Sequence, residues 1–125
     1  MAYYDTIYVV QGDTLPEVRI TLRDSNTAAD GQTLDPDDDT TWAPIDLSDA
    51  TVRIKMRALG EETISSTILA ARQLPYTEGK VFFQFTDGAL DVDEGVYEAE
   101  IEITYTSGSV QTVYDLLRFN VRAQF

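Results

Sequence analysis

Four aspartates in one segment of the chain have a spacing that could bind calcium. They fall at positions 1, 3, 5 and 12 of a count resembling an EF-hand loop, and they are Asp35, Asp37, Asp39 and Asp46. Their carboxylates are hard oxygen ligands of the kind that Ca²⁺ prefers. Against the motif, Thr40 stands where the turn glycine belongs, and Pro36 and Pro44 interrupt the segment. A solvated acidic loop is therefore the interpretation that we prefer, with calcium as the alternative.

The remaining acidic residues could support two further kinds of site. A second acidic group could also bind a cation; its members are Asp87, Asp91, Asp93 and Glu94. Pairs of carboxylates could in principle catalyse glycoside hydrolysis. With 22 Asp and Glu among 125 residues, however, neighbouring acids arise without any catalytic role. We therefore expect a protein that is not an enzyme and that has no cofactor, unless calcium binds.

The residue types that are missing exclude several classes of function. The sequence contains no Cys and no His, which excludes disulfides, thiolate metal sites and the histidine relays of hydrolases. Nine Lys and Arg against 22 Asp and Glu give a net charge of -13. Nucleic acids and anionic membranes are therefore disfavoured as partners, because both attract basic side chains. The first residues lack the pattern of a secretory signal, so we expect a protein made in the cytoplasm.

The elements that would position these side chains are β-strands, because the dominant hydrophobic period is two. The clearest alternations cover residues 17–23, 51–58, 97–105 and 117–125. Weaker strands are predicted over residues 7–10, 80–86 and 110–116. The apolar face of this last segment conflicts by one residue with the face that begins at Leu117, which predicts a bulge or bend near Leu116.

Two segments do not follow the alternation. Residues 61–73 combine a helical spacing of apolar residues with many β-branched ones, and we favour short strands there over a helix. Residues 24–46 have no periodicity and predict a long acidic loop, which in a compact domain is usually functional or mobile. The pattern predicts one domain over residues 1–125, an all-β, immunoglobulin-like antiparallel β-sandwich of about seven to eight strands.

Three motifs, in this order, carry a resemblance to a known family. Residues 10–16 read VQGDTLP, residues 45–52 read IDLSDATV and residues 93–100 read DEGVYEAE. Their order and spacing resemble the N-terminal domain of phage baseplate upper proteins, and the resemblance covers most of the chain. It implies an immunoglobulin-like module in the virion of a tailed phage or prophage, most often in the tail or baseplate. A neck or collar component, or a capsid decoration protein, is an alternative position.

Two of the predicted strands carry charged rows of opposite sign. The basic row is Arg53, Lys55 and Arg57, and the acidic row is Glu98, Glu100 and Glu102. If the two strands are neighbours, the rows form cross-strand ion pairs, each worth under about 1 kcal/mol. The plainer interpretation, which we prefer, is that both rows are solvated outer faces. In a third interpretation, one row meets an opposite row on a neighbouring subunit and guides its docking.

Three aromatic residues lie outside the strong alternations, namely Tyr3, Tyr4 and Trp42. Interfaces favour such residues. The N-terminal arm could therefore lie on a neighbouring subunit, or it could cover its own sandwich. Together with the two charged rows, these aromatic residues are the interface candidates of the sequence.

These observations predict a non-enzymatic structural protein of a tailed-phage virion, a tail, baseplate or neck component that acts through assembly contacts. Its partners would be other virion proteins and copies of itself, with strand addition at a sheet edge as one mode of contact. A capsid decoration protein of the same virion is one alternative. The other is a calcium-stabilised adhesion or carbohydrate-binding module, against which the lack of an export signal counts.

Overall fold

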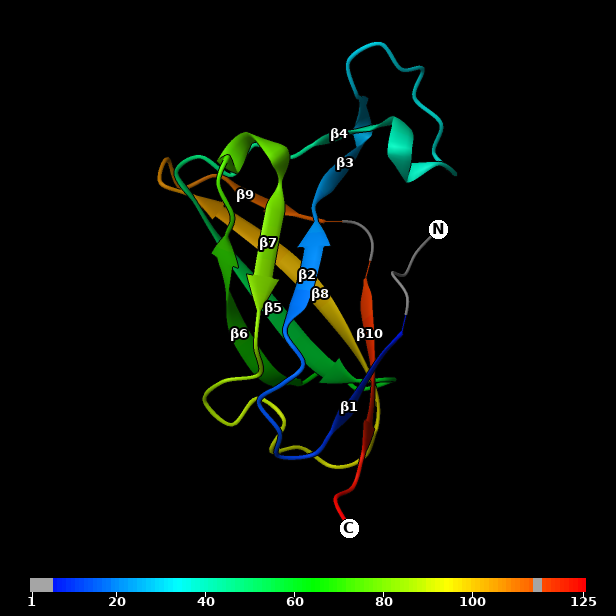
Figure 1. The fold of residues 1–125 in the computed structure, drawn as a ribbon, viewed down its shortest axis with the longest axis vertical. Coiled ribbons are helices and arrows are strands. Elements are labelled where there is room, and N and C mark those ends of the chain that lie inside the picture. Colours follow the sequence, from blue (N-terminus) through cyan, green and yellow to red (C-terminus); the bar gives the residue numbers. More distant parts are fainter. Residues whose placement is uncertain (1–5, 114–115) are drawn as a thin grey trace.

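The computed structural model describes residues 6–113 and 116–125, and its regular structure is almost entirely β-strand. Figure 1 shows an elongated body with a smaller ribbon projecting from one end. The strands of the body are β1 (Ile7–Val10), β2 (Val18–Thr21), β5 (Ala50–Ala58), β6 (Ile64–Arg72), β7 (Lys80–Phe83), β8 (Gly95–Tyr105), β9 (Val110–Thr112) and β10 (Leu117–Arg122). A short 3-10 turn, η2 (Tyr76–Glu78), connects β6 to β7.

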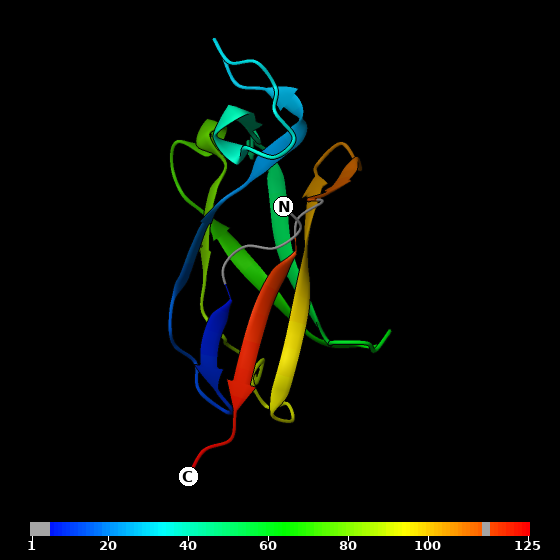
Figure 2. The same ribbon diagram turned by 90° about the vertical axis from the view of Figure 1, so that its right-hand side faces the viewer.

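The strands form a sandwich whose two layers share β6. Hydrogen bonding follows the order β1-β10-β8-β5-β6-β7-β2, and β9 also pairs with β8. Most of β6 pairs with β5, whereas Ala71 and Arg72 at its end pair with β7. The sheet therefore curls over, and β2 lies on the opposite side of the body from β8 (Figure 2). The predicted immunoglobulin-like β-sandwich is confirmed, with the difference that β1 and β10 pair in parallel.

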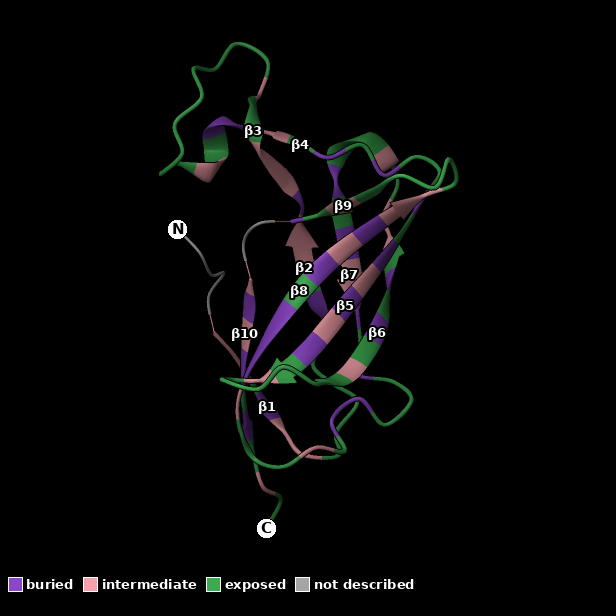
Figure 3. Ribbon diagram, turned by 180° about the vertical axis from the view of Figure 1, so that it is seen from behind, coloured by how far each residue is buried: buried purple, intermediate pink, exposed green. Residues whose placement is uncertain are grey.

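Alternation in the sequence becomes alternation of burial in the strands. In β5, Val52, Ile54 and Met56 are 0% exposed, and Figure 3 shows the same alternation along β8. Ile54 lies opposite Ile101 in the register of these two strands. Three aromatic rings meet edge to face between 5.5 and 6.5 Å apart, a favourable geometry; they belong to Phe83, Phe85 and Phe119. Both layers thus contribute to one hydrophobic core.

A tyrosine at the start of β8 fixes the entry of that strand into the core. The hydroxyl of Tyr97, a residue that is 5% exposed, donates a hydrogen bond to the carbonyl oxygen of Asp93 at 2.6 Å. Burial and the nearby carboxylate of Asp93 raise the pKa of Tyr97. Gly95 lies between them with a φ of 146°, which side-chain-bearing residues rarely adopt. This contact is the tyrosine corner of immunoglobulin-like sandwiches.

The segments with irregular patterns are also strands. Residues 61–73 contain β6, so the preference for strand over helix is confirmed. Both β9 and β10 pair with β8, but between Thr112 and Leu117 the chain advances five residues while β8 advances only three, from Glu102 to Ala99. The predicted irregularity before Leu117 is therefore present as two extra residues relative to β8.

The acidic segment of residues 24–46 is not a plain loop, which corrects the sequence prediction. It contains most of β3 (Arg23–Ala28), then the 3-10 turn η1 (Asp39–Thr41) and β4 (Trp42–Pro44). β3 and β4 pair as a separate two-stranded sheet. Together with the segment that joins the two strands we call it the ribbon, and it projects from the sandwich in Figure 1. Residues 24–46 carry no alternation because their strands pair with each other in this short ribbon and do not cover the main core.

Candidate functional site

The two charged rows lie side by side on the outer surface of the sandwich. β5 and β8 are antiparallel neighbours, and their register places Arg53 opposite Glu102, Lys55 opposite Glu100, and Arg57 opposite Glu98. The residues between them along each strand are buried, so all six side chains belong to the outer face. The rows therefore meet within one chain, as the cross-strand interpretation requires, and both lie on the outer face of the sheet.

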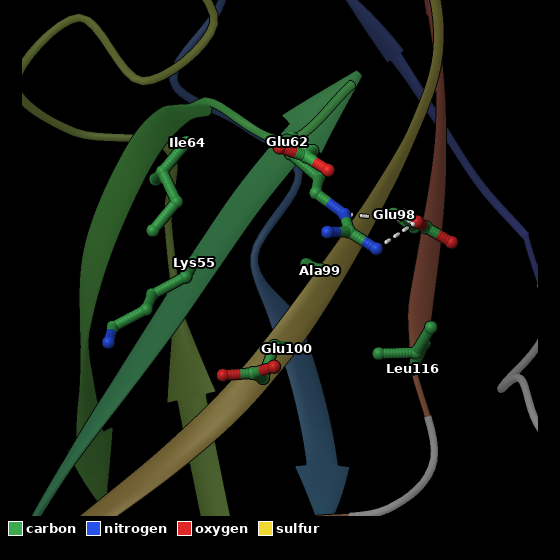
Figure 4. A pocket seen from close by; sticks show the side chains of 8 residues that line it. Lys55, Glu62, Ile64, Glu98, Ala99, Glu100 and Leu116 are labelled. Atoms are coloured by element: carbon green, nitrogen blue, oxygen red, sulfur yellow. Dashed lines mark hydrogen bonds and ion pairs between the residues drawn. The ribbon is translucent and has the colours of Figure 1, made fainter. Parts of the chain in front are cut away.

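Two ion pairs connect the rows. Nζ of Lys55 lies 2.7 Å from Oε2 of Glu102, which is diagonal and not directly opposite in the register. Arg57 donates to Oε1 of Glu98 from Nε at 3.1 Å and from Nη2 at 2.9 Å (Figure 4). The side chain of Glu98 is only 9% exposed. Because an enclosed carboxylate that loses a partner is costly, removing Arg57 from Glu98 should destabilise the domain more than removing Lys55 from the more exposed Glu102.

Arg53 and Glu100 are the row members without such a pair. Neither side chain has a hydrogen bond or ion pair with any residue in the described ranges. Glu100 is exposed, and Arg53 is partly exposed. One positive and one negative charge on this surface therefore remain available to another molecule.

Apolar side chains border the charged rows on both flanks. On β6, Ile64 is 49% exposed and Leu69 is 68% exposed, and they pair with Arg57 and Arg53 of β5. On the other flank, Leu116 lines a hollow of about 150 Å³ together with Ile64 and side chains of both rows (Figure 4). We call this surface the β5–β8 face; it consists of the two charged rows with Ile64, Leu69 and Leu116. These three aliphatic residues were not among the candidates of the sequence.

Hydrogen bonds shape the tip of the ribbon. The hydroxyl of Thr41 donates to the carbonyl oxygen of Asp38 at 2.7 Å, and the indole N–H of Trp42 donates to that of Asp35 at 2.9 Å. The carboxylate of Asp38 caps η1 by accepting from the hydroxyl and the backbone N–H of Thr40. These two bonds lower the pKa of Asp38. The ribbon is therefore a projection with a defined shape.

The four aspartates of the calcium candidate do not converge in the structure. Across residues 6–113 and 116–125, no three His, Cys, Asp or Glu side chains lie where they could hold a metal ion. Asp35 accepts a hydrogen bond from the backbone N–H of Asp37, and Asp46 accepts one from Ser48, both at 2.9 Å. Bonds from the hydroxyl and backbone N–H of Ser48 lower the pKa of Asp46. These carboxylates shape turns of the backbone, and Asp39 belongs to η1.

The structure corrects the interpretation of Trp42 as a contact residue. Trp42 is 5% exposed, and its indole N–H is bonded within the ribbon. It therefore anchors the acidic segment from inside, in agreement with the tendency of a buried indole N–H to find an acceptor. Tyr3 and Tyr4 lie outside the described residues.

The fold and the β5–β8 face define an immunoglobulin-like domain with a charge-balanced outer surface. No family model matches the sequence, and no curated protein matches it. Among solved structures, the chain is similar to CopC from Methylosinus trichosporium OB3b, with a TM-score of 0.44 and 9% identity, over 96% of this chain and 86% of that chain. A likeness of this strength carries no argument about function. Nowhere in the described ranges does the chain form a helix with the length and apolar character needed to cross a bilayer.

Proposed function

We propose that this protein is a non-enzymatic structural component of a tailed-phage virion, in the tail, baseplate or neck, and that it acts through protein–protein contacts. The observation that carries the proposal is the β5–β8 face, where matched charges and exposed aliphatic side chains lie on a sandwich with a continuous core. Surfaces of this kind guide docking and fix the register between partners.

The assignment to a virion draws on the motifs that resemble phage baseplate upper proteins, and two of them lead into the strands of this face. Residues 45–52 contain Leu47, which is 0% exposed and lies in the turn before β5. Residues 93–100 contain the Tyr97 corner and the start of the acidic row on β8. The segments that carry the resemblance therefore position the basic and the acidic row.

In a virion, the chain would contact other virion proteins and copies of itself. The β5–β8 face and the ribbon are separate elements, one on the sheet surface and the other at the end of the body (Figure 1). Two separate contact elements allow one subunit to join two neighbours. In a symmetric particle, many such contacts act together, because each one raises the effective concentration for the next.

The proposal is tested by asking whether the protein is part of released particles. Particles from cells that carry the gene, produced by prophage induction or infection, would be purified on a density gradient and analysed by mass spectrometry and immunogold microscopy. We expect the protein to sediment with tailed particles and the label to mark the tail, baseplate or neck. Label on the head would favour the capsid decoration protein instead, and protein found only in the soluble fraction would contradict a virion role.

A further inference from the structure

We propose that the β5–β8 face is the interface of a symmetric homodimer, in which the basic row of each copy lies over the acidic row of the other and Arg53 forms an ion pair with the partner's Glu100. The inference rests on the proposed function and deepens it, because it names a second copy of the chain as the partner of this face. Its basis is that two rows of opposite sign run side by side along neighbouring strands. A surface with this layout is complementary to itself.

Only one orientation of the two faces matches opposite charges. A two-fold axis between β5 and β8, parallel to both strands, places β5 of one copy over β8 of the other. Each residue keeps its position along the strand direction. A two-fold axis across the strands would instead oppose basic row to basic row. In the first arrangement, Arg53 lies about 7 Å along the strand from the partner's Glu100, within reach of an arginine side chain. The two row members that lack an ion-pair partner within their own chain can thus form an ion pair between the two copies.

This face is also where two copies of an acidic protein can approach with little repulsion. The chain has a net charge of -13, but the three basic and three acidic side chains of the two rows cancel, and Arg118 on β10 and Glu62 beside the hollow add one charge of each sign. Many of the surplus acids lie elsewhere, in the ribbon at residues 30–39 and in the loop at residues 87–94. Charges beyond the contact are screened over about 8 Å at physiological ionic strength. The balanced face is therefore the favoured place of contact between copies.

The apolar flanks fit the same arrangement. The rotation carries β6 of one copy over the strands that flank β8 in the other, β9 and β10. By the strand registers, Ile64 then lies over Arg118 and Leu69 over Thr112 of the second copy, on either side of Leu116. Burial of these exposed aliphatic side chains supplies attraction that does not depend on salt, while the charged rows set the orientation.

The size of the face predicts a weak dimer. β5 and β6 each have 9 residues, and such strands are roughly 30 Å long, while four neighbouring strands span roughly 19 Å. Each copy therefore contributes roughly 600 Å², at the low end for specific interfaces. We expect a dissociation constant of roughly 10 μM to 1 mM.

Sedimentation equilibrium of the full chain tests the inference with two charge-reversal variants, Arg53→Glu and Glu100→Arg. In either variant alone, the dimer opposes like charges, and we expect its dissociation constant to rise roughly tenfold or more. In an equimolar mixture, the heterodimer restores opposite charges at both contacts, so association should return to within roughly threefold of the wild-type value. Repulsion inside each chain is unchanged by mixing, so recovery in the mixture reports the contact between copies.

Two control variants separate the face from the overall charge. Arg19→Glu on β2, in the other layer, and Asp30→Arg in the ribbon change the net charge by the same amounts far from the face. We expect these controls to leave the dissociation constant within roughly threefold of wild type. Thermal melts of all four variants check that the sandwich remains folded.

Three results would each overturn the inference. They are a wild-type chain that stays monomeric at about 1 mM, a dimer that the two face variants do not weaken, and a mixture that associates no better than either variant alone. The particle experiment decides the proposed function separately. A chain that is found in particles but is monomeric in isolation would leave a virion role in place and assign this face to a different virion protein.

Discussion

Replacing Gly79 with alanine should destabilise the junction between the sandwich and the ribbon. Gly79 follows η2 and has a φ of 71°, in the left-handed region that favours glycine. A Cβ atom at this position would collide with the carbonyl oxygen of Leu22 and lie 3.1 Å from the backbone nitrogen of Ile45. These backbone groups are hydrogen-bonded, since Leu22 N–H donates to Gly79 at 2.7 Å and Ile45 N–H donates to Leu22 at 2.9 Å. Neither backbone group can therefore move away from the added Cβ atom without weakening its hydrogen bond.

Two contributions add to the expected loss in the free energy of unfolding. A residue with a side chain in the left-handed region costs about 1–2 kcal/mol. Displacing buried backbone to relieve the collision resembles overpacking of a core, which costs about 1–3 kcal/mol. Gly79→Ala should therefore lower the free energy of unfolding by roughly 2–5 kcal/mol. That is a large fraction of the roughly 5–15 kcal/mol that stabilises a typical domain.

Two other glycines provide matched controls. Gly31 and Gly60 have φ values of 74° and 85°, and an added Cβ at either position would meet nothing within 4 Å. Alanine at these positions should cost only about 1–2 kcal/mol, because only the backbone contribution applies. Urea denaturation measures all three variants, with far-UV circular dichroism reporting the sandwich and the fluorescence of Trp42 reporting the ribbon. A Gly79→Ala loss within about 0.5 kcal/mol of the controls would refute the collision argument.

Further substitutions test individual contacts. Trp42→Phe removes the indole N–H bond in the ribbon and should lower the free energy of unfolding by about 1–2 kcal/mol in urea denaturation. Tyr97→Phe removes the tyrosine corner and should cost about 1 kcal/mol at neutral pH. Burial raises the pKa of Tyr97. The contribution of this residue to stability is therefore complete below the ordinary tyrosine pKa of about 10 and is lost as the pH rises through the folded value. In melts at alkaline pH, the Phe variant should therefore lose less stability with rising pH than the wild type. Glu98→Gln, at an enclosed carboxylate, should cost about 1–3 kcal/mol, whereas Glu102→Gln should cost less than about 1 kcal/mol by the same denaturation assay.

Distinct outcomes would contradict these expectations. An unchanged Trp42→Phe variant would show that the ribbon does not depend on the indole bond. Equal alkaline losses in wild type and Tyr97→Phe would assign the effect to another group, such as Tyr105, whose pKa is raised by burial and by two nearby aspartates. Equal losses for the variants at Glu98 and Glu102 would show that the difference in exposure between their ion pairs does not affect stability.

The strands with strict alternation could be predicted because their burial follows a local pattern. β5 and β8 are the clearest cases, and their charged rows were already visible in the sequence. That the rows meet, with Arg53 opposite Glu102, depends on which strands pair, and no local pattern fixes that choice. β6 was ambiguous because its register with β5 shifts between Met56 and Arg57, so that Ile64 and Leu69 share a face at an odd spacing.

The ribbon could not be predicted for a different reason. β3 contains mainly polar residues, and its partner β4 is only 3 residues long. Its shape depends on single contacts, such as the Thr41 hydroxyl on Asp38 and the Trp42 indole on Asp35, which leave no periodic signal. For the same reason the sequence suggests Trp42 as a contact residue, since its acceptor is a backbone carbonyl that the sequence does not mark.

The parallel pairing of β1 with β10 has a mechanical consequence. Ile7 lies beside Phe119 and Val10 lies beside Arg122, so both strands run in the same direction. A force that draws the Ile7 end away from the Arg122 end acts along the strands, and it shears every hydrogen bond of the pair together. The same force on an antiparallel hairpin would open its bonds one after another. Along this edge, therefore, the domain is arranged to withstand stretching.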